Sequence, residues 1–233
     1  MKLDILVFGA HPDDVELGCG GTIIKHVEQG FKVGVIDLTQ GELGTRGSAK
    51  TRKKESEIAS DILGICLREN MGFKDGFFKD NEKNKLALIQ KIRTYKPSIV
   101  ITNAPNDRHP DHGRASSITV DACFLSGLEK IDTDQPIWRP AAIYHYIQFN
   151  NIAPDFVIDI TNQIDSKIRA VKSYSTQFYN PDSKESPTII SEKGFLESIT
   201  YRAKDLGRQT NCQYAEGFIS HQLSRVDSLM DLK

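Results

Sequence analysis

A short apolar run near the N-terminus ends abruptly in side chains that can bind a metal. Residues 5–10 are rich in β-branched and aromatic types, which is typical of a buried strand. His11, Pro12, Asp13 and Asp14 follow at once. His11 and Asp14 lie three positions apart, and Pro12 restricts the backbone between them, so a tight turn can direct both side chains to one point. We therefore expect the chemistry where this strand stops.

A second polar cluster follows another strand-like run, residues 99–102. This cluster is Arg108-His109-Pro110-Asp111-His112. Either cluster alone is typical of a solvated turn, but two of them, each after a buried strand, favour a metal site. If the strands are parallel neighbours, both clusters lie beyond their carboxyl ends, where ligands bind in open sheets.

Two imidazoles and one carboxylate form a set that leaves one zinc position open for water. The spacing selects neither between Asp13 and Asp14 nor between His109 and His112. Non-haem iron oxygenases use the same donor set, but they are usually all-β, so this alternative is disfavoured by analogy of fold only.

Strand-like runs alternate with amphipathic stretches along most of the chain, which predicts an α/β fold. We expect residues 1–233 to form a single domain, a Rossmann-like three-layer α/β/α sandwich with a mostly parallel sheet. Predicted helices include residues 22–29, residues 51–63 with Ile58 in the buried stripe, and residues 113–125. Gly18, Gly20 and Gly21 precede the first of these and are expected to allow close helix packing.

Composition and charge exclude several classes of partner. The chain has 233 residues and a formal net charge of -1 with both signs mixed, so neither a nucleic-acid stripe nor a polybasic membrane patch is expected. The four cysteines contain no C-x-x-C pair, which indicates a reduced, cytoplasmic protein. The N-terminal apolar run is too short for a signal peptide, and no segment reaches membrane-spanning length. Small molecules are the expected partners.

A nucleotide-binding interpretation rests on the order strand, glycines, helix, with Asp37 in the place of a ribose-binding acid. The residues after the first strand do not spell G-x-G-x-x-G, and two carboxylates there would repel a pyrophosphate. A non-catalytic sugar- or nucleotide-binding module therefore remains only a secondary hypothesis.

The motifs together resemble one enzyme family, the zinc-dependent N-acetylglucosaminyl deacetylases of the PIG-L/LmbE family, and within it the bacillithiol biosynthesis branch. The resemblance covers nearly the whole chain. It rests on Gly9-Ala10-His11-Pro12-Asp13-Asp14, Gly18-Cys19-Gly20-Gly21, Thr51-Arg52, Asp107-Arg108, His109-Pro110-Asp111-His112, Trp138-Arg139-Pro140, Tyr144-His145-Tyr146 and Tyr214-Ala215-Glu216-Gly217-Phe218.

The resemblance implies a role for each polar residue of the two clusters. His11, Asp14 and His112 would bind Zn²⁺, with Fe²⁺ as the alternative in the cell. Asp13 would be the general base, and a protonated His109 would stabilise or protonate the intermediate.

The resemblance also implies a substrate. It would be an N-acetylglucosaminyl conjugate, most narrowly N-acetylglucosaminyl malate, which loses its acetyl group as acetate. Arg52 and Arg108 match basic positions that suit the carboxylates of malate. Family resemblance further suggests a homo-oligomer.

Overall fold

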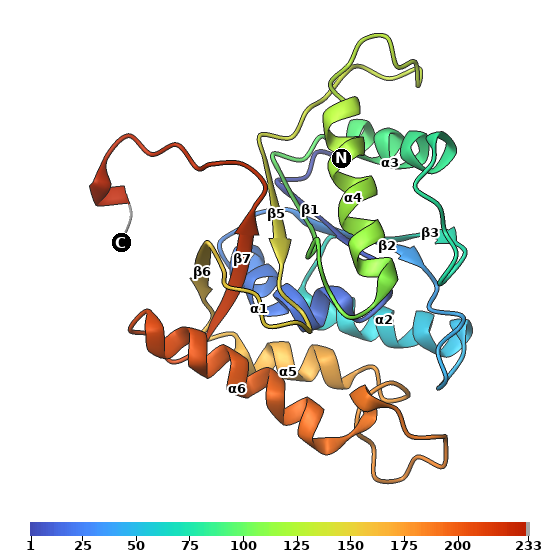
Figure 1. Ribbon diagram of the computed structural model, residues 1–233, viewed down its shortest axis with the longest axis vertical. Helices are drawn as coiled ribbons and strands as arrows, with labels where there is room; N and C mark the ends of the chain where they lie inside the picture. The colour runs from blue at the N-terminus through green and yellow to red at the C-terminus, as the bar shows by residue number, and fades with distance from the viewer. Residues whose placement is uncertain (232–233) are drawn as a thin grey trace.

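The computed structural model describes residues 1–231, which form one seven-stranded sheet between two layers of helices (Figure 1). The strand order is β3-β2-β1-β4-β5-β7-β6. The strands are β1 Ile5–Gly9, β2 Val33–Thr39, β3 Leu67–Phe73, β4 Ile99–Asn103, β5 Ala142–Tyr146, β6 Phe156–Asp159 and β7 Ala215–Ser220. The helices are α1 Asp14–Glu28, α2 Ala49–Leu63, α3 Glu82–Tyr95, α4 Pro110–Leu125, α5 Ile164–Lys172 and α6 Lys193–Gln209, with short 3₁₀ turns at Ile189–Ser191 and Leu229–Asp231.

The first five strands are parallel, and β1 pairs with β2 on one side and with β4 on the other. Strand order therefore reverses between β1 and β4, and open α/β sheets bind ligands in the crevice beyond such a reversal. The sequence analysis did not predict β7, which is antiparallel to both β5 and β6. The sheet is mostly parallel, as expected.

Alternate side chains of β1 enter two different cores. Leu6 and Phe8 pack with apolar residues of α3 and α4, whereas Ile5 and Val7 pack with residues of α1, α2 and α5. This period of two is what a strand covered on both faces requires. Figure 1 shows the outcome, with α3 and α4 on one side of the sheet and α1, α2, α5 and α6 on the other.

Helix α1 begins earlier than residue 22, where the sequence analysis placed its start. It starts at Asp14 and includes the glycines, with non-helical angles at Cys19. A Cβ on Gly18 would lie 2.1 Å from the ring of Tyr146, and one on Gly21 would lie 2.8 Å from Ile160. The expected role in close packing is confirmed for Gly18 and Gly21, which lie inside the helix, whereas a Cβ on Gly20 would make only ordinary contacts.

Two other helix predictions also need correction. Helix α4 begins at Pro110 instead of residue 113, since proline suits the first position of a helix. Ile58 was expected in the buried stripe of α2 together with Ala59 and Leu63, but only Ala59 and Leu63 are buried, and Ile58 is 53% exposed. Within residues 1–231, no helix combines the length and apolar character that crossing a bilayer requires.

Candidate metal centre

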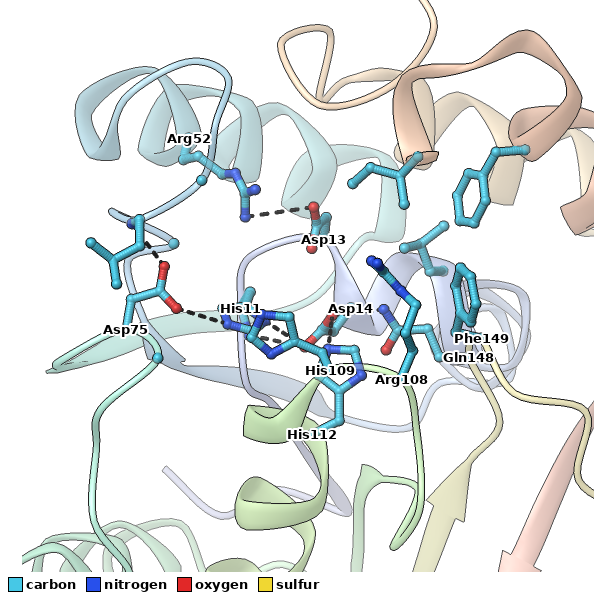
Figure 2. A pocket seen from close by; sticks show the side chains of 17 residues that line it. His11, Asp13, Asp14, Arg52, Asp75, Arg108, His109, His112, Gln148 and Phe149 are labelled. Carbon is cyan, nitrogen blue, oxygen red and sulfur yellow. Dashed lines mark hydrogen bonds and ion pairs between the residues drawn. The ribbon is translucent and has the colours of Figure 1, made fainter. Parts of the chain in front are cut away.

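The two predicted clusters meet beyond the carboxyl ends of β1 and β4, as the sequence analysis expected (Figure 2). The ring centroids of His11 and His112 are 5.6 Å apart, and His109 lies 4.6 Å from His11 and 5.3 Å from His112. A ring nitrogen from each of these three histidines lies within 4.8 Å of the others. The fold thus gathers three nitrogen donors at one point.

Asp14 lies between two of these imidazoles and is 2% exposed. Its Oδ2 is 3.5 Å from Nδ1 of His11, and its Oδ1 is 3.2 Å from Nε2 of His112. The same carboxylate accepts hydrogen bonds from the amides of Asn103, at 3.1 Å, and Gln148, at 2.7 Å. Asp14 is therefore fixed in place by four neighbours before any ligand arrives.

Two further carboxylates orient the histidine rings from behind. Nε2 of His11 lies 3.0 Å from Asp75 Oδ1, and Nδ1 of His112 lies 2.8 Å from Asp107 Oδ2. When those nitrogens donate hydrogen bonds to the acids, the other nitrogen of each ring faces Asp14. That nitrogen then carries the lone pair that can bind a metal. Metal-binding histidines commonly have such carboxylate partners. Among residues 1–231, no carboxylate makes a comparable hydrogen bond to the His109 ring, which favours His112 as the ligand.

The electrostatics of the cluster suit a cation. Burial opposes the charged form of His112, yet Asp14 and Asp107 raise its pKa to about 9. The pKa of His11 is also raised, against burial, by Asp111, Asp14 and Asp75. The carboxylates around the two rings therefore stabilise positive charge at this point. They would stabilise a divalent cation there in the same way. Two imidazoles and a carboxylate therefore fit the zinc or iron expected from the sequence.

Asp13 differs from its neighbour in both backbone and surroundings. Its φ is 122°, which is strained for a residue with a side chain and is often found at functional sites. Burial, helped by the charge of Asp14, raises the pKa of Asp13 to about 7, although Arg52 opposes the rise. A carboxylate with such a pKa can exchange protons near neutral pH, as a general base must.

The guanidinium of Arg52 is held by protein groups, unlike that of a residue that is free to bind substrate. Its Nη1 lies 3.5 Å from Asp13 Oδ2 and donates to the Pro12 carbonyl at 3.0 Å, and its Nη2 donates to Gln177. The side chain is buried and lines the pocket. These bonds assign Arg52 to holding Asp13, with only part of its surface facing the cavity.

The surroundings of His109 favour the neutral ring over the protonated form that the resemblance implied. Burial and the charges of His11 and His112 lower its pKa to about 4. Its Nδ1 accepts the backbone N–H of Asp111 at 3.2 Å, so the proton of the neutral ring resides on Nε2. The ring can therefore still donate one hydrogen bond.

A cavity of about 220 Å³ opens over the cluster. Its lining contains all the candidate site residues, which are His11, Asp13, Asp14, Arg52, Arg108, His109 and His112. Arg108 lies at the exposed side of the cavity, with its Cζ 4.6 Å from the centroid of the Phe149 ring. No acidic partner of the Arg108 guanidinium is found within residues 1–231, so this cation is available to a ligand. Leu17, Ile190 and Phe195 complete an apolar wall nearby.

The sequence analysis missed the supporting residues Asp75, Asn103 and Gln148, and it quoted Asp107 without giving it a role. Asp75 and Gln148 each follow a parallel strand by two residues, and Asn103 is the last residue of β4. Polar side chains at the ends of β3, β4 and β5 were the available signal, because parallel strands bring those ends to one edge.

Several known proteins are similar to this chain in sequence. The family model PIG-L, described as GlcNAc-PI de-N-acetylase, matches residues 6–123. A diacetylchitobiose deacetylase of Thermococcus kodakarensis is 28% identical over 227 residues, covering 91% of this chain and 81% of its own. A probable N-acetyl-alpha-D-glucosaminyl L-malate deacetylase 2 of Bacillus anthracis is 26% identical over 187 residues, covering 75% and 81%.

Two other similarities bear on fold and chemistry. A 4-oxalmesaconate hydratase of Pseudomonas putida is 26% identical over 189 residues, covering 74% of this chain and 73% of its own. The crystal structure of the conserved protein TT1542 from Thermus thermophilus superimposes with a TM-score of 0.87 and 36% identity, covering 97% of this chain and 98% of that one. With a family model that matches more than half of its residues, this chain belongs to the PIG-L family.

Proposed function

We propose that this protein is a metal-dependent deacetylase that removes the acetyl group from an N-acetylglucosaminyl conjugate. The observation that carries the proposal is the convergence of His11, Asp14 and His112 beside a second acid, Asp13, whose pKa is raised to about 7. Family membership and the deacetylase relatives support the same reaction.

In the proposed reaction His11, Asp14 and His112 would hold Zn²⁺, with Fe²⁺ as the alternative. A cation bound there would supply Lewis-acid chemistry, which lowers the pKa of water and polarises a carbonyl group. Asp13 accepts the proton of the attacking water and later gives it to the leaving amine nitrogen. Water and the amide thus yield acetate and a glucosamine derivative.

The remaining residues of the site orient these groups. Neutral His109 donates a hydrogen bond from its Nε2–H to the oxygen that gains negative charge, a contribution of about a few kcal/mol by analogy with oxyanion holes. Arg52 keeps Asp13 directed at the cavity, and Asp75 and Asp107 keep the two imidazoles in register.

The substrate is proposed more narrowly as N-acetylglucosaminyl malate in bacillithiol biosynthesis. Arg108 supports this choice, because an unpaired guanidinium stacked on Phe149 suits a carboxylate of the malate group. The malate deacetylase relative agrees, whereas the diacetylchitobiose deacetylase points to a second sugar in the same place. Comparing malate glycoside with diacetylchitobiose as substrates would decide between them.

The proposal also includes a cytoplasmic location and assembly into a homo-oligomer. All four cysteines are free, which suits a reducing cytoplasm. Exposed apolar side chains of the C-terminal tail, including Leu223 and Leu229, support association into a homo-oligomer. Light scattering of the purified protein tests the oligomer.

The decisive experiment combines metal analysis with an acetate assay. Wild type should contain about one divalent metal per chain and release acetate, and His112→Ala should do neither. His221→Ala is the matched control, because His221 is exposed and lies away from the cavity. Equal activity of wild type and His112→Ala would exclude the metal-hydrolase function.

The same assay separates the alternatives. A hydratase, as in the Pseudomonas relative, would add water to a double bond without releasing acetate. An iron oxygenase would consume dioxygen, and a binding module would show no turnover with added zinc or iron.

A further inference from the structure

The break in helix α1 is filled by a buried ion pair from two other elements. The helix loses its regular geometry at Cys19, where φ is -144° and ψ is 22°. Lys167 of α5 and Glu216 of β7 meet there, with 2.5 Å between Nζ and Oε1. Each is only 3% exposed. Glu216 belongs to the motif of residues 214–218, to which no role has been given so far.

The ion pair replaces hydrogen bonds that a continuous helix would make for itself. Glu216 accepts the backbone N–H of Gly21 at 3.0 Å and that of Thr22 at 2.7 Å. Lys167 donates to the carbonyl of Leu17 at 2.8 Å. Side chains therefore satisfy the donors that begin the second part of α1 and an acceptor that ends the first part.

The part of α1 before the break carries Asp14 of the metal centre. This part, residues 14–18, is little more than one turn, which is too short to be stable as an isolated helix. Its orientation must come from tertiary contacts. Lys167 supplies one through Leu17, and the close approach of Gly18 to the ring of Tyr146 supplies another.

We propose that Lys167 and Glu216 are positioning residues of the metal centre. By holding the first turn of α1 at a fixed angle to the rest of the helix, they place Asp14 between His11 and His112. The inference rests on the proposed metal-dependent function. It predicts an effect on metal binding, whereas a purely structural ion pair would affect only the stability of the fold.

The test uses the double variant Lys167→Met with Glu216→Gln. Removing one partner leaves an unpaired buried charge, whereas removing both leaves none, so the double variant is the one most able to fold. Competition with a chelator should show metal affinity at least about tenfold weaker, the lower end of effects seen when groups behind a metal ligand are replaced. In the metal-free protein, amide hydrogen exchange of residues 14–22 should be faster.

Arg93→Met is the matched control. Arg93 is also a buried cation, 2% exposed, that donates to the backbone carbonyls of Ser126 and Ile131 at 3.0 and 2.7 Å, but it lies on the opposite face of the sheet in α3. It should lower the free energy of unfolding without weakening metal binding. Should the double variant not fold, Lys167→Gln with Glu216→Gln takes its place, since it also removes both charges and leaves polar side chains beside the freed backbone groups.

Wild-type metal affinity and unchanged exchange protection in the Lys167/Glu216 variant would overturn the inference. An equal loss of metal affinity in Arg93→Met would also overturn it, because general destabilisation would then be the cause. If wild type itself binds no divalent metal, the proposed function fails separately. Exchange of residues 14–22 in the metal-free protein then tests only whether the ion pair holds the first turn of α1, and unchanged protection would overturn that step as well.

Discussion

Asp13 and Asp14 are adjacent but differ in pKa. The strained backbone at Asp13, between β1 and α1, directs the two carboxylates toward different neighbours. Asp13 has φ 122° and faces Arg52, while Asp14 begins α1 and faces two imidazoles. Although burial raises the pKa of both acids, His112 and His11 lower that of Asp14, whereas that of Asp13 rises to about 7. One carboxylate therefore remains ionised for a cation, and the other can exchange a proton.

Asp13→Asn should keep the metal and lose most turnover. Asparagine is similar in shape but cannot accept the proton of water, so kcat should fall by about 10²–10⁴-fold, the usual contribution of a general base. Metal analysis and acetate release measure the two effects, and Asp14→Asn serves as the comparison that should lose metal. Loss of metal from Asp13→Asn would mean that the two roles are reversed.

Asp107→Asn should weaken metal binding although Asp107 is not a proposed ligand. Its carboxylate fixes the His112 ring, and removing such partners typically costs about 10–100-fold in metal affinity. Chelator competition measures the change. The control is Asp205→Asn, in an exposed pair with Arg208 on α6, which should leave affinity unchanged. Equal affinities of Asp107→Asn and wild type would remove this role.

At the scale of elements, the sequence predicted the two strands that precede the polar clusters but not the starts of the helices that follow them. The runs before His11 and Arg108 are β1 and β4, because buried strands are continuous apolar segments. The start of α1 was placed too late because Gly18, Gly20 and Gly21 are unusual inside a helix, and that of α4 because its first turn consists of Pro110 and polar site residues. The apolar periodicity that signals a helix is absent there, and β7 was missed because its residues, Ala215–Ser220, include glycine and glutamate.

Gly18→Ala should destabilise the protein, although alanine is the better helix former. The added Cβ would lie 2.1 Å from the Tyr146 ring, and overpacking of this kind costs about 1–3 kcal/mol. Gly194→Ala in the first turn of α6 is the control, since nothing lies within 4 Å of its Cβ, and it should stabilise by no more than about 0.5 kcal/mol. Urea unfolding measures both changes. If Gly18→Ala and wild type had the same free energy of unfolding, the Tyr146 ring would have to move freely to make room for the added methyl group.

At the scale of the whole molecule, topology explains what the sequence could not specify. Motif spacing indicated two polar clusters, and parallel pairing of β1 with β4 brings them to one edge. The contribution of Asp75 depends on a loop after β3, and that of Gln148 on the position of β5 beside β4. The local signal, a polar residue shortly after a strand, does not show which strand ends lie beside β1 and β4. Only the complete strand order reveals these residues.

The cation should also stabilise the fold, because its proposed ligands come from two segments about a hundred residues apart, β1–α1 and α4. At a free metal concentration about 100 times Kd, binding adds about 2.7 kcal/mol to the free energy of unfolding. For a chain of this size that raises Tm by about 5–10 °C. Calorimetry of chelated and metal-loaded protein measures the shift. His112→Ala should show little or none of it, and a wild-type Tm that does not respond to metal would contradict a cation shared by the two segments.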